Sequence, residues 1–261
     1  MINVHFHWDV FLVAALLEAA YVYGLLRLRP DPRWLHPIEK RHVVLFTLGV
    51  LVLAGVQATP FHDLSDRSFS MHMVQHMLLT LVMPPLLLLG IPSWLLQPWL
   101  RNPFNLVVAR VLTHPVMAIV AFNAALALWH VPLLYDLAVW DYNIHVVNHL
   151  MYILTGLLLW WPVFSPVPEL PRLNYPLQML YLFIQSLVPA ILASFMTFSE
   201  TVIYTSYATR VLLWDMTPLD DQLIGGLIMK VAGGAILWFV AIVIFFRWFS
   251  QEETEAERSW D

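Results

Sequence analysis

The sequence predicts an all-α integral membrane protein with seven transmembrane helices, an N-terminus outside the membrane and a cytoplasmic C-terminus. Three observations lead to this prediction: an apolar composition, a series of long apolar windows, and an uneven distribution of lysine and arginine. Of the 261 residues, 60% are hydrophobic and 12% are charged, and the mean hydropathy is +0.70. Soluble domains carry about 25% charged residues, so this composition favours a chain built for lipid.

Seven apolar windows follow one another along the chain. A helix needs about 20 mostly apolar residues to cross the hydrocarbon core of a bilayer. The windows that meet this requirement are 9–27, 42–59, 70–89, 115–131, 145–162, 176–198 and 223–246. The connections are too short for an extramembrane domain, so we expect one domain over residues 1–261, with a polar, frayed cytoplasmic tail at 250–261. The N-terminus lacks the basic region of a signal peptide, so we expect the first helix to be retained.

Four of the windows contain residues that are unusual in a membrane helix. Pro84 and Pro85 remove backbone donors late in the third window, so we expect that helix to kink or stop early, and Pro189 has the same effect on the sixth. Glu18 and Lys230 lie inside the first and seventh windows. An ionisable residue within a membrane is a functional candidate, but hydrogen bonding of Glu18 to a neighbouring helix and outward extension of Lys230 remain open.

Lysine and arginine predict the orientation, because cytoplasmic loops of membrane proteins carry an excess of both. Ten of these residues lie on one side of the predicted membrane and two on the other. The ten are Arg27, Arg29, Arg33, Lys40, Arg41, Arg101, Arg110, Arg172, Arg247 and Arg258, and the two are Arg67 and Arg210. The side with ten is therefore predicted to be cytoplasmic.

Histidines gather on the predicted outer side. Eight of the 11 lie there, namely His5, His7, His62, His72, His76, His130, His145 and His149. In MHMVQHM and IHVVNHL, His72 and His76, and likewise His145 and His149, recur at i and i+4 on one helix face. That spacing allows two imidazoles to share one metal ion. We expect the two pairs to lie at similar depth and, if the third and fifth helices are neighbours, to form one metal site that His130 joins.

Several polar residues are candidates to support these ligands. Gln75 and Asn148 stand between the members of the two pairs, and Asp141 lies four residues before His145. Hydrogen bonds from such neighbours orient metal-binding imidazoles. Asp136, Asp220 and Asp221 are further acidic candidates, the last two also as partners of Lys230.

The composition narrows the identity of the metal and excludes several functions. There is no cysteine, so thiolate sites, iron–sulfur clusters and disulfides are excluded. Imidazole suits zinc, copper, iron and nickel, and the nearby Met71, Met73 and Met77 add a slight preference for copper. A net charge of −5 without a basic patch argues against nucleic acid. No nucleotide-binding loop or nucleophile elbow appears, so we do not expect an enzyme.

Four stretches resemble the CtaG family of bacterial cytochrome c oxidase assembly factors. They are HMVQHMLLTLVMPPLLLLGIP, LWHVPLLYD, HVVNHLMYILTGLLLWWPV and PLDDQLIGGLIM, and they occur in family order between about residues 62 and 249. This polytopic, seven-span family is distinct from the single-span, cysteine-bearing copper chaperone of the same name. The matching stretches contain the five histidines His72, His76, His130, His145 and His149 and the acids Asp136, Asp220 and Asp221.

The resemblance implies a metallochaperone-like role in maturing haem–copper oxidases, by supplying or holding copper for their metal centres. It further implies a bacterial cytoplasmic (inner) membrane location and, as partners, cytochrome c oxidase subunits or other assembly factors. Membrane lipid surrounds such a protein, and a homo-oligomer is possible. Lys230 departs from the family, in which an aromatic residue often stands at this position, so the resemblance assigns no role to it.

Three other interpretations remain open from the sequence. His76 and His149 would clamp a haem b between the third and fifth helices if the protein were a b-type cytochrome. Glu18, Lys230 and the histidines would serve a proton or cation transporter, although no internal repeat supports one. A non-catalytic oxidase-associated subunit would use none of these residues to bind metal.

Overall fold

The computed structural model of the protein describes residues 8–28, 39–57, 60–208 and 213–258. Every regular element in these ranges is a helix, which confirms the predicted all-α fold. In chain order the elements are α1 (Trp8–Arg27), α2 (Lys40–Gln57), α3 (Pro60–Ser65), α4 (Phe69–Met77), η2 (Leu78–Val82), α5 (Met83–Gly90), η3 (Ser93–Leu95), α6 (Gln97–Leu100), α7 (Pro103–Leu112), α8 (Pro115–Trp129), α9 (Pro132–Trp140), α10 (Tyr142–Phe164), α11 (Tyr175–Thr197), α12 (Thr205–Ala208), η4 (Leu213–Asp215), α13 (Pro218–Leu227), η5 (Ile228–Ala232) and α14 (Gly233–Arg258).

Within the described ranges, six helical runs are long and apolar enough to cross a membrane, and a bent pair raises the number to seven. The pair is α7 and α8, which meet at 63°. The helix predicted at 115–131 is therefore present as α8, and the prediction did not include the bend that joins it to α7. The cause is Pro115, because the residue before a proline is pushed out of the helical region, and His114 has an extended ψ of 133°.

The third span does not stop at its prolines. It runs from Phe69 to Gly90 as α4, η2 and α5, where η2 is a π-helical turn just before Pro84. Proline has no N–H, so the carbonyl group of Thr80, four residues earlier, loses its helical partner. The indole Nε1 of Trp160 donates to that oxygen at 2.9 Å. The lost helix bond is thus replaced by one from α10. The sixth span, α11, likewise continues through Pro189.

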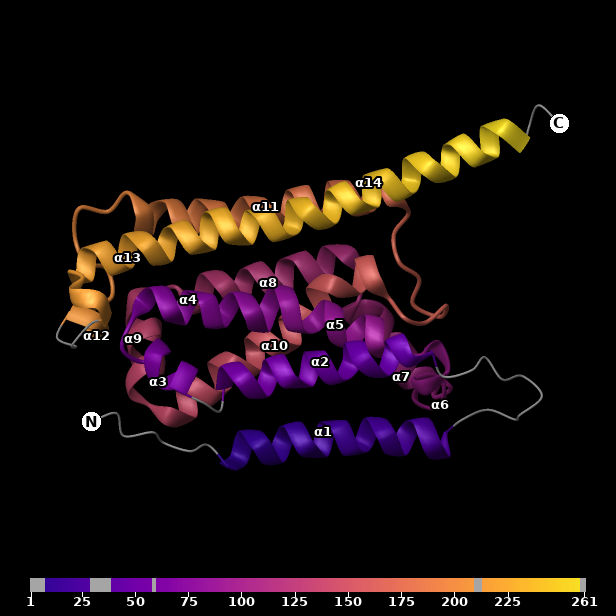
Figure 1. Cartoon of the computed structure of the whole chain (residues 1–261), viewed down its shortest axis with the longest axis horizontal. Helices are drawn as coiled ribbons and strands as arrows, with labels where there is room; N and C mark the ends of the chain where they lie inside the picture. The colour runs from indigo at the N-terminus through magenta and orange to yellow at the C-terminus, as the bar shows by residue number, and fades with distance from the viewer. Residues whose placement is uncertain (1–7, 29–38, 58–59, 209–212, 259–261) are drawn as a thin grey trace.

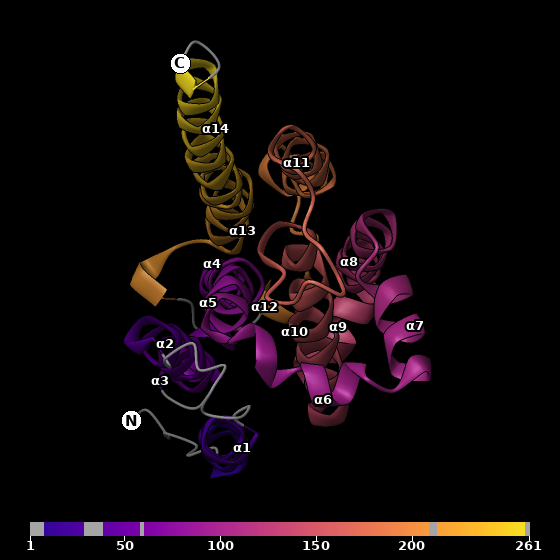
Figure 2. The same ribbon diagram turned by 90° about the vertical axis from the view of Figure 1, so that its right-hand side faces the viewer.

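The third and fifth spans form the centre of the bundle. Sixty-one per cent of the third span and 44% of the fifth, α10, are buried, against at most 28% of each of the other unbent spans. Among the main contacts, α2 packs on α5, α8 on α10, α13 on α4, and α11 on α14. Figure 2 looks nearly along the helices and shows α4, α5 and α10 between α1, α8 and α11.

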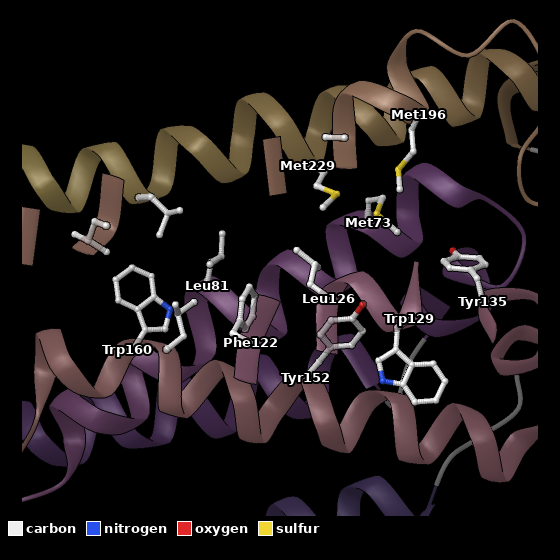
Figure 3. Packing of buried hydrophobic residues seen from close by; sticks show 14 of the residues in the cluster. Met73, Leu81, Phe122, Leu126, Trp129, Tyr135, Tyr152, Trp160, Met196 and Met229 are labelled. Carbon is white, nitrogen blue, oxygen red and sulfur yellow. The ribbon is translucent and has the colours of Figure 1, made fainter. Parts of the chain in front are cut away.

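Two hydrophobic clusters fill the bundle. The larger one joins α4, α8, α9, α10, α11 and the last span, and Figure 3 shows part of it, including Trp160, Tyr152 and Phe122. The second joins α1, α2 and the third span around Phe46 and Met83. Large apolar side chains on the outward faces remain exposed, as expected for helices that face lipid.

The helices run back and forth between two ends of the bundle (Figure 1), and α1 begins at one end whereas α14 finishes at the other. The connections with α3, α9 and α12 lie at the end where α1 begins, and α6 and α7 lie at the opposite end. Within the predicted tail at 250–261, the described residues are helical as far as Arg258, and Trp248 Nε1 donates to Glu252 Oε1 one turn away at 3.0 Å. Which end faces outward stays a prediction.

Candidate functional site

The two histidine pairs lie near the N-terminal starts of α4 and α10. The hydroxyl of Ser68 caps α4 and accepts from the N–H of Met71, and the carboxylate of Asp141 caps α10. These caps set the helix register, so both i, i+4 pairs begin within the first two turns. His72 and His149 are buried, with exposed fractions of 5% and 3%.

Three imidazoles from the third and fifth spans lie together. The Nε2 atoms of His72 and His76 are hydrogen-bonded at 2.6 Å, and their ring centroids are 4.3 Å apart. The ring of His149 lies 5.3 Å from that of His76 and 6.2 Å from that of His72. The predicted convergence of the two spans is therefore present in the structure.

The row of imidazoles continues beyond these three to a residue that the sequence did not single out as a ligand. The ring of His145 lies 4.1 Å from that of His149, and the ring of His62 on α3 lies 5.1 Å from that of His145. No spacing links His62 to the pairs, since it lies in a separate short helix. Its position on the same predicted side was the one signal available in the sequence.

His130 lies on the other side of a tyrosine. The ring of Tyr152 packs 4.4 Å from that of His76, and its hydroxyl oxygen lies 3.4 Å from Nδ1 of His130. Nδ1 of His130 donates to the carbonyl of Leu126 at 2.7 Å, so Nε2 carries the lone pair.

Tyrosines close the site toward the end of the bundle. The ring of Tyr135 on α9 lies 5.3 Å from that of His72. Its hydroxyl lies 3.3 Å from that of Tyr207, and burial raises the pKa of Tyr135 well above its usual value. Tyr204 donates its hydroxyl to the backbone carbonyl of His130 at 3.2 Å. The phenols of Tyr135 and Tyr204 therefore pack against His72 and His130.

Some of the buried ring nitrogens have no hydrogen-bond partner within the described part of the chain. They are Nδ1 of His76, Nε2 of His130 and both ring nitrogens of His149. A buried polar atom without a partner costs about 1–3 kcal/mol. Across the same residues, no three His, Asp or Glu side chains are already arranged around a common metal position. The imidazoles therefore lie close together, and several of their nitrogens lack a hydrogen bond, but they are not arranged as ligands around one ion.

Two of the polar residues predicted to support the pairs, Gln75 and Asp141, have other partners. Gln75 is fully buried, and its amide nitrogen donates to the carbonyl of Val56 at 2.7 Å and lies 3.3 Å from Nδ1 of His62. Gln75 therefore contacts the ring of His62, which lies outside the pairs it was expected to support. Asn148 is buried in α10. The carboxylate of Asp141 accepts from the first N–H groups of that helix.

The other three acids also act on helix starts. Asp136 accepts from the Thr205 hydroxyl at 2.7 Å and the Ser206 N–H at 3.1 Å, which fixes α12 against α9. Asp220 forms a capping box with Thr217 at the start of α13. The fully buried Asp221 accepts from the start of α4, through Ser68 Oγ, Phe69 N and Ser70 N. Their use as direct support for a metal ligand stays a prediction.

Glu18 lies apart from the histidine pairs, whereas Lys230 lines a cavity that His76 also lines. The hydroxyl of Thr47 on α2 donates to Oε1 of Glu18 at 2.7 Å, which supports the interpretation of Glu18 as a hydrogen-bonded packing residue. Nζ of Lys230 lies 5.1 Å from the centroid of the Phe198 ring, in a cation–π contact. His5, His7, His36 and Arg210 fall outside the described residues.

The fold and the site define a class: a helical membrane protein with a buried cluster of imidazoles near one end of its bundle. The sequence profile of the cytochrome c oxidase caa3 assembly factors (Caa3_CtaG) matches residues 19–251. The chain belongs to this family, which confirms the resemblance noted from the sequence.

Curated relatives come from mycobacteria. The uncharacterized proteins Mb0105 of Mycobacterium bovis and MT0111 of Mycobacterium tuberculosis are each 28% identical to this chain over 260 residues. The uncharacterized protein ML1998 of Mycobacterium leprae is 26% identical over 262 residues. The alignments cover 93–94% of this chain but 39% of each relative, so the chain spans about two fifths of their length. No solved structure matches the chain.

Proposed function

We propose that the protein serves in cytochrome c oxidase assembly as a copper-binding factor, in which the cluster of His72, His76, His145 and His149 holds copper near the outer membrane surface. The family supports the pathway. One observation carries the copper role: buried imidazoles from two spans, with unpartnered nitrogens on His76 and His149, lie within contact distance of each other.

The ligand set suits a transferable ion. Imidazole binds copper well, and the absence of cysteine excludes a thiolate site from which copper would leave slowly. Two nitrogens bound to one tetrahedral ion lie about 3.3 Å apart when each bond is about 2.0 Å. The Nε2 atoms of His72 and His76 lie 2.6 Å apart, so loading needs a side-chain shift of less than 1 Å. The ring that donates the Nε2 proton would change tautomer, with that proton on Nδ1, so that both Nε2 atoms could bind the ion.

The packing favours an ion over a macrocycle. A haem b between His76 and His149 would have to separate their rings, which lie 5.3 Å apart, while Tyr152 covers His76 at 4.4 Å. The proposal extends to the setting: a bacterial cytoplasmic membrane, a non-catalytic role, and oxidase subunits or other assembly factors as partners. A homo-oligomer is compatible with the exposed apolar helix faces.

The test compares the purified protein with a His76→Ala, His149→Ala double variant in mild detergent. The expected result is a colourless wild-type protein that takes up copper, measured by mass spectrometry of bound metals, and a variant that takes up far less. His114→Ala is the matched control, because His114 is exposed at the start of α8, away from the cluster. A Soret band that disappears in the double variant would identify a haem protein and overturn the proposal. Equal copper uptake in all three proteins would also overturn it.

A further inference from the structure

A cavity of about 150 Å³ lies between the third span and helices α8, α10, α11, η5 and α14. It is separate from the contacts among His72, His145 and His149, but His76 and His130 both line it. Three methionines line it as well, namely Met73, Met77 and Met229. The cavity therefore brings soft sulfur donors beside two buried imidazoles, each with an unpartnered ring nitrogen among the described residues.

Both π-helical segments of the protein's described part pass this cavity. Thr80 in η2 and Met229 in η5 belong to its lining. A π turn costs helix stability and is found preferentially at functional sites. The η5 segment lies between Gly226 of α13 and Gly233 of α14, where a Cβ would lie 2.6 Å from Thr197 Oγ1 and 2.7 Å from Met77 Cε respectively. Two such turns around one cavity indicate that its shape is specified by the fold.

The methionines come from two spans that glycines bring close together. Met73 and Met77 lie one turn apart on α4. A Cβ added to Gly225 would lie 3.3 Å from Cγ of Met73, and one added to Gly233 would lie 2.7 Å from Cε of Met77. Figure 3 shows Met73 and Met229 reaching toward each other, with Met196 of α11 beside them in the same cluster.

Methionine is often only filler in a core, and Met151 provides the comparison. Its sulfur already accepts a hydrogen bond from Trp129 Nε1 at 3.3 Å, and it does not line the cavity. Met73, Met77 and Met229 instead line the cavity, and no hydrogen bond to their sulfurs is found within the described part of the chain. They are therefore available to bind a ligand.

The charges of the residues that line the cavity narrow the class of ligand that it can bind. No Asp or Glu is among the described residues that line the cavity, whereas Lys230 is. The cost of moving an ion into an apolar interior rises with the square of its charge, and a lysine repels a divalent cation more strongly than a monovalent one, so this lining disfavours Cu(II) more than Cu(I). Thioether sulfur selects Cu(I) among biological metals, and imidazole accepts it as well.

We infer that this cavity is a binding site for Cu(I), held by the thioethers of Met73, Met77 and Met229 together with His76. The inference rests on the proposed copper function and specifies the oxidation state of the ion. His76 belongs to both the cavity and the imidazole row, so the ion passes between sulfur and nitrogen ligands at that residue. The protein handles copper in its reduced form on the side of the bundle that faces α11 and α14.

The experiment measures Cu(I) affinity with ascorbate as reductant and bicinchoninate as competing chelator, and Cu(II) uptake without reductant. A Met77→Leu, Met229→Leu double variant keeps side-chain volume but removes two sulfurs. We expect its Cu(I) affinity to fall at least about tenfold, with unchanged Cu(II) uptake. Met151→Leu is the matched control and should change neither. X-ray absorption of the Cu(I)-loaded wild type, which needs no variant, should show a copper–sulfur shell.

The outcomes separate this inference from the proposed function. A Cu(I) spectrum without sulfur ligands, or a double variant with wild-type Cu(I) affinity, would overturn the cavity site while leaving copper binding at the imidazole row intact. His149→Ala, which lies outside the cavity lining, should then be the variant that loses copper. A wild-type protein that binds neither oxidation state would overturn both.

Discussion

Asp221 connects the site to the last span through three hydrogen bonds. Its carboxylate accepts from Ser68 Oγ at 2.7 Å, Phe69 N at 2.6 Å and Ser70 N at 3.1 Å, all at the first turn of α4. The first N–H groups of a helix have no partner within it, and a negative charge there is favoured by the helix dipole. Asp221 therefore fixes the helix that carries His72 and His76 against α13.

The prediction at the residue scale concerns this carboxylate. Asp221→Asn places an amide donor against backbone N–H groups, so that a buried donor has no acceptor. This should lower the free energy of unfolding by about 1–3 kcal/mol. The neighbouring Asp220→Asn is the control, because Asp220 caps an exposed turn and its loss costs about 1 kcal/mol or less. Thermal unfolding in detergent gives both values. An Asp221 variant no less stable than the Asp220 variant would show that the cap is dispensable.

A second residue-scale prediction concerns Tyr152, which stands between His76 and His130. Tyr152→Phe removes the hydroxyl 3.4 Å from His130 but keeps the ring against His76. We expect the fold and the copper content to be retained, because the ring supplies most of the packing. Tyr152→Ala opens a void in the core and should cost about 3–5 kcal/mol. Circular dichroism on heating distinguishes the two, and equal melting of both variants would contradict the packing role.

At the scale of elements, glycines set how closely the spans approach. A Cβ on Gly90 would lie 2.5 Å from the backbone N of Phe46, so α2 and α5 touch backbone to backbone there. The carbonyl of Gly90 also accepts the hydroxyl of Tyr21 at 2.8 Å, which ties α1 to the same point. The first three spans therefore meet at one residue.

Gly90→Ala should push α2 away from α5, because backbone atoms cannot move aside as a flexible side chain can. We expect the free energy of unfolding to fall by about 1–3 kcal/mol, as in other overpacked cores. Gly55→Ala is the matched control in α2. No atom lies within 4 Å of a Cβ added there, and alanine favours a helix by about 0.5–1 kcal/mol over glycine. Unfolding in detergent should show that Gly55→Ala is at least as stable as the wild type and that Gly90→Ala is less stable. The reverse order would contradict this account of the close approach.

For the whole molecule, the orientation in the membrane decides whether the site faces the outside. The imidazole cluster lies at the end of the bundle with α3, α9 and α12, and the basic connections near α6 and α7 lie at the other (Figure 1). Positive charge is retained in the cytoplasm, so the cluster is predicted to face outward.

The absence of cysteine makes this orientation simple to test, because each introduced thiol is the only one. Asn143→Cys places an exposed thiol at the start of α10, and Ser250→Cys places one on the far part of α14. A membrane-impermeant maleimide should label the first variant in intact cells and the second only after lysis. The opposite pattern would show that the cluster faces the cytoplasm and would exclude copper delivery from the outside.

The sequence by itself determined the features that depend on neighbouring residues. The apolar windows follow from hydropathy, and the i, i+4 histidine pairs follow from the 3.6-residue period of the helix. The excess of lysine and arginine at alternate connections can likewise be read directly from the sequence. All three are local properties. Only the tertiary structure decided that His62 joins the imidazole row and that Tyr152 lies between His76 and His130. It also decided that Asp221 caps α4 from the last span and that Met229 lies near Met73. Each of these joins residues from different elements, and such contacts depend on how helices pack and where glycine or proline changes their path.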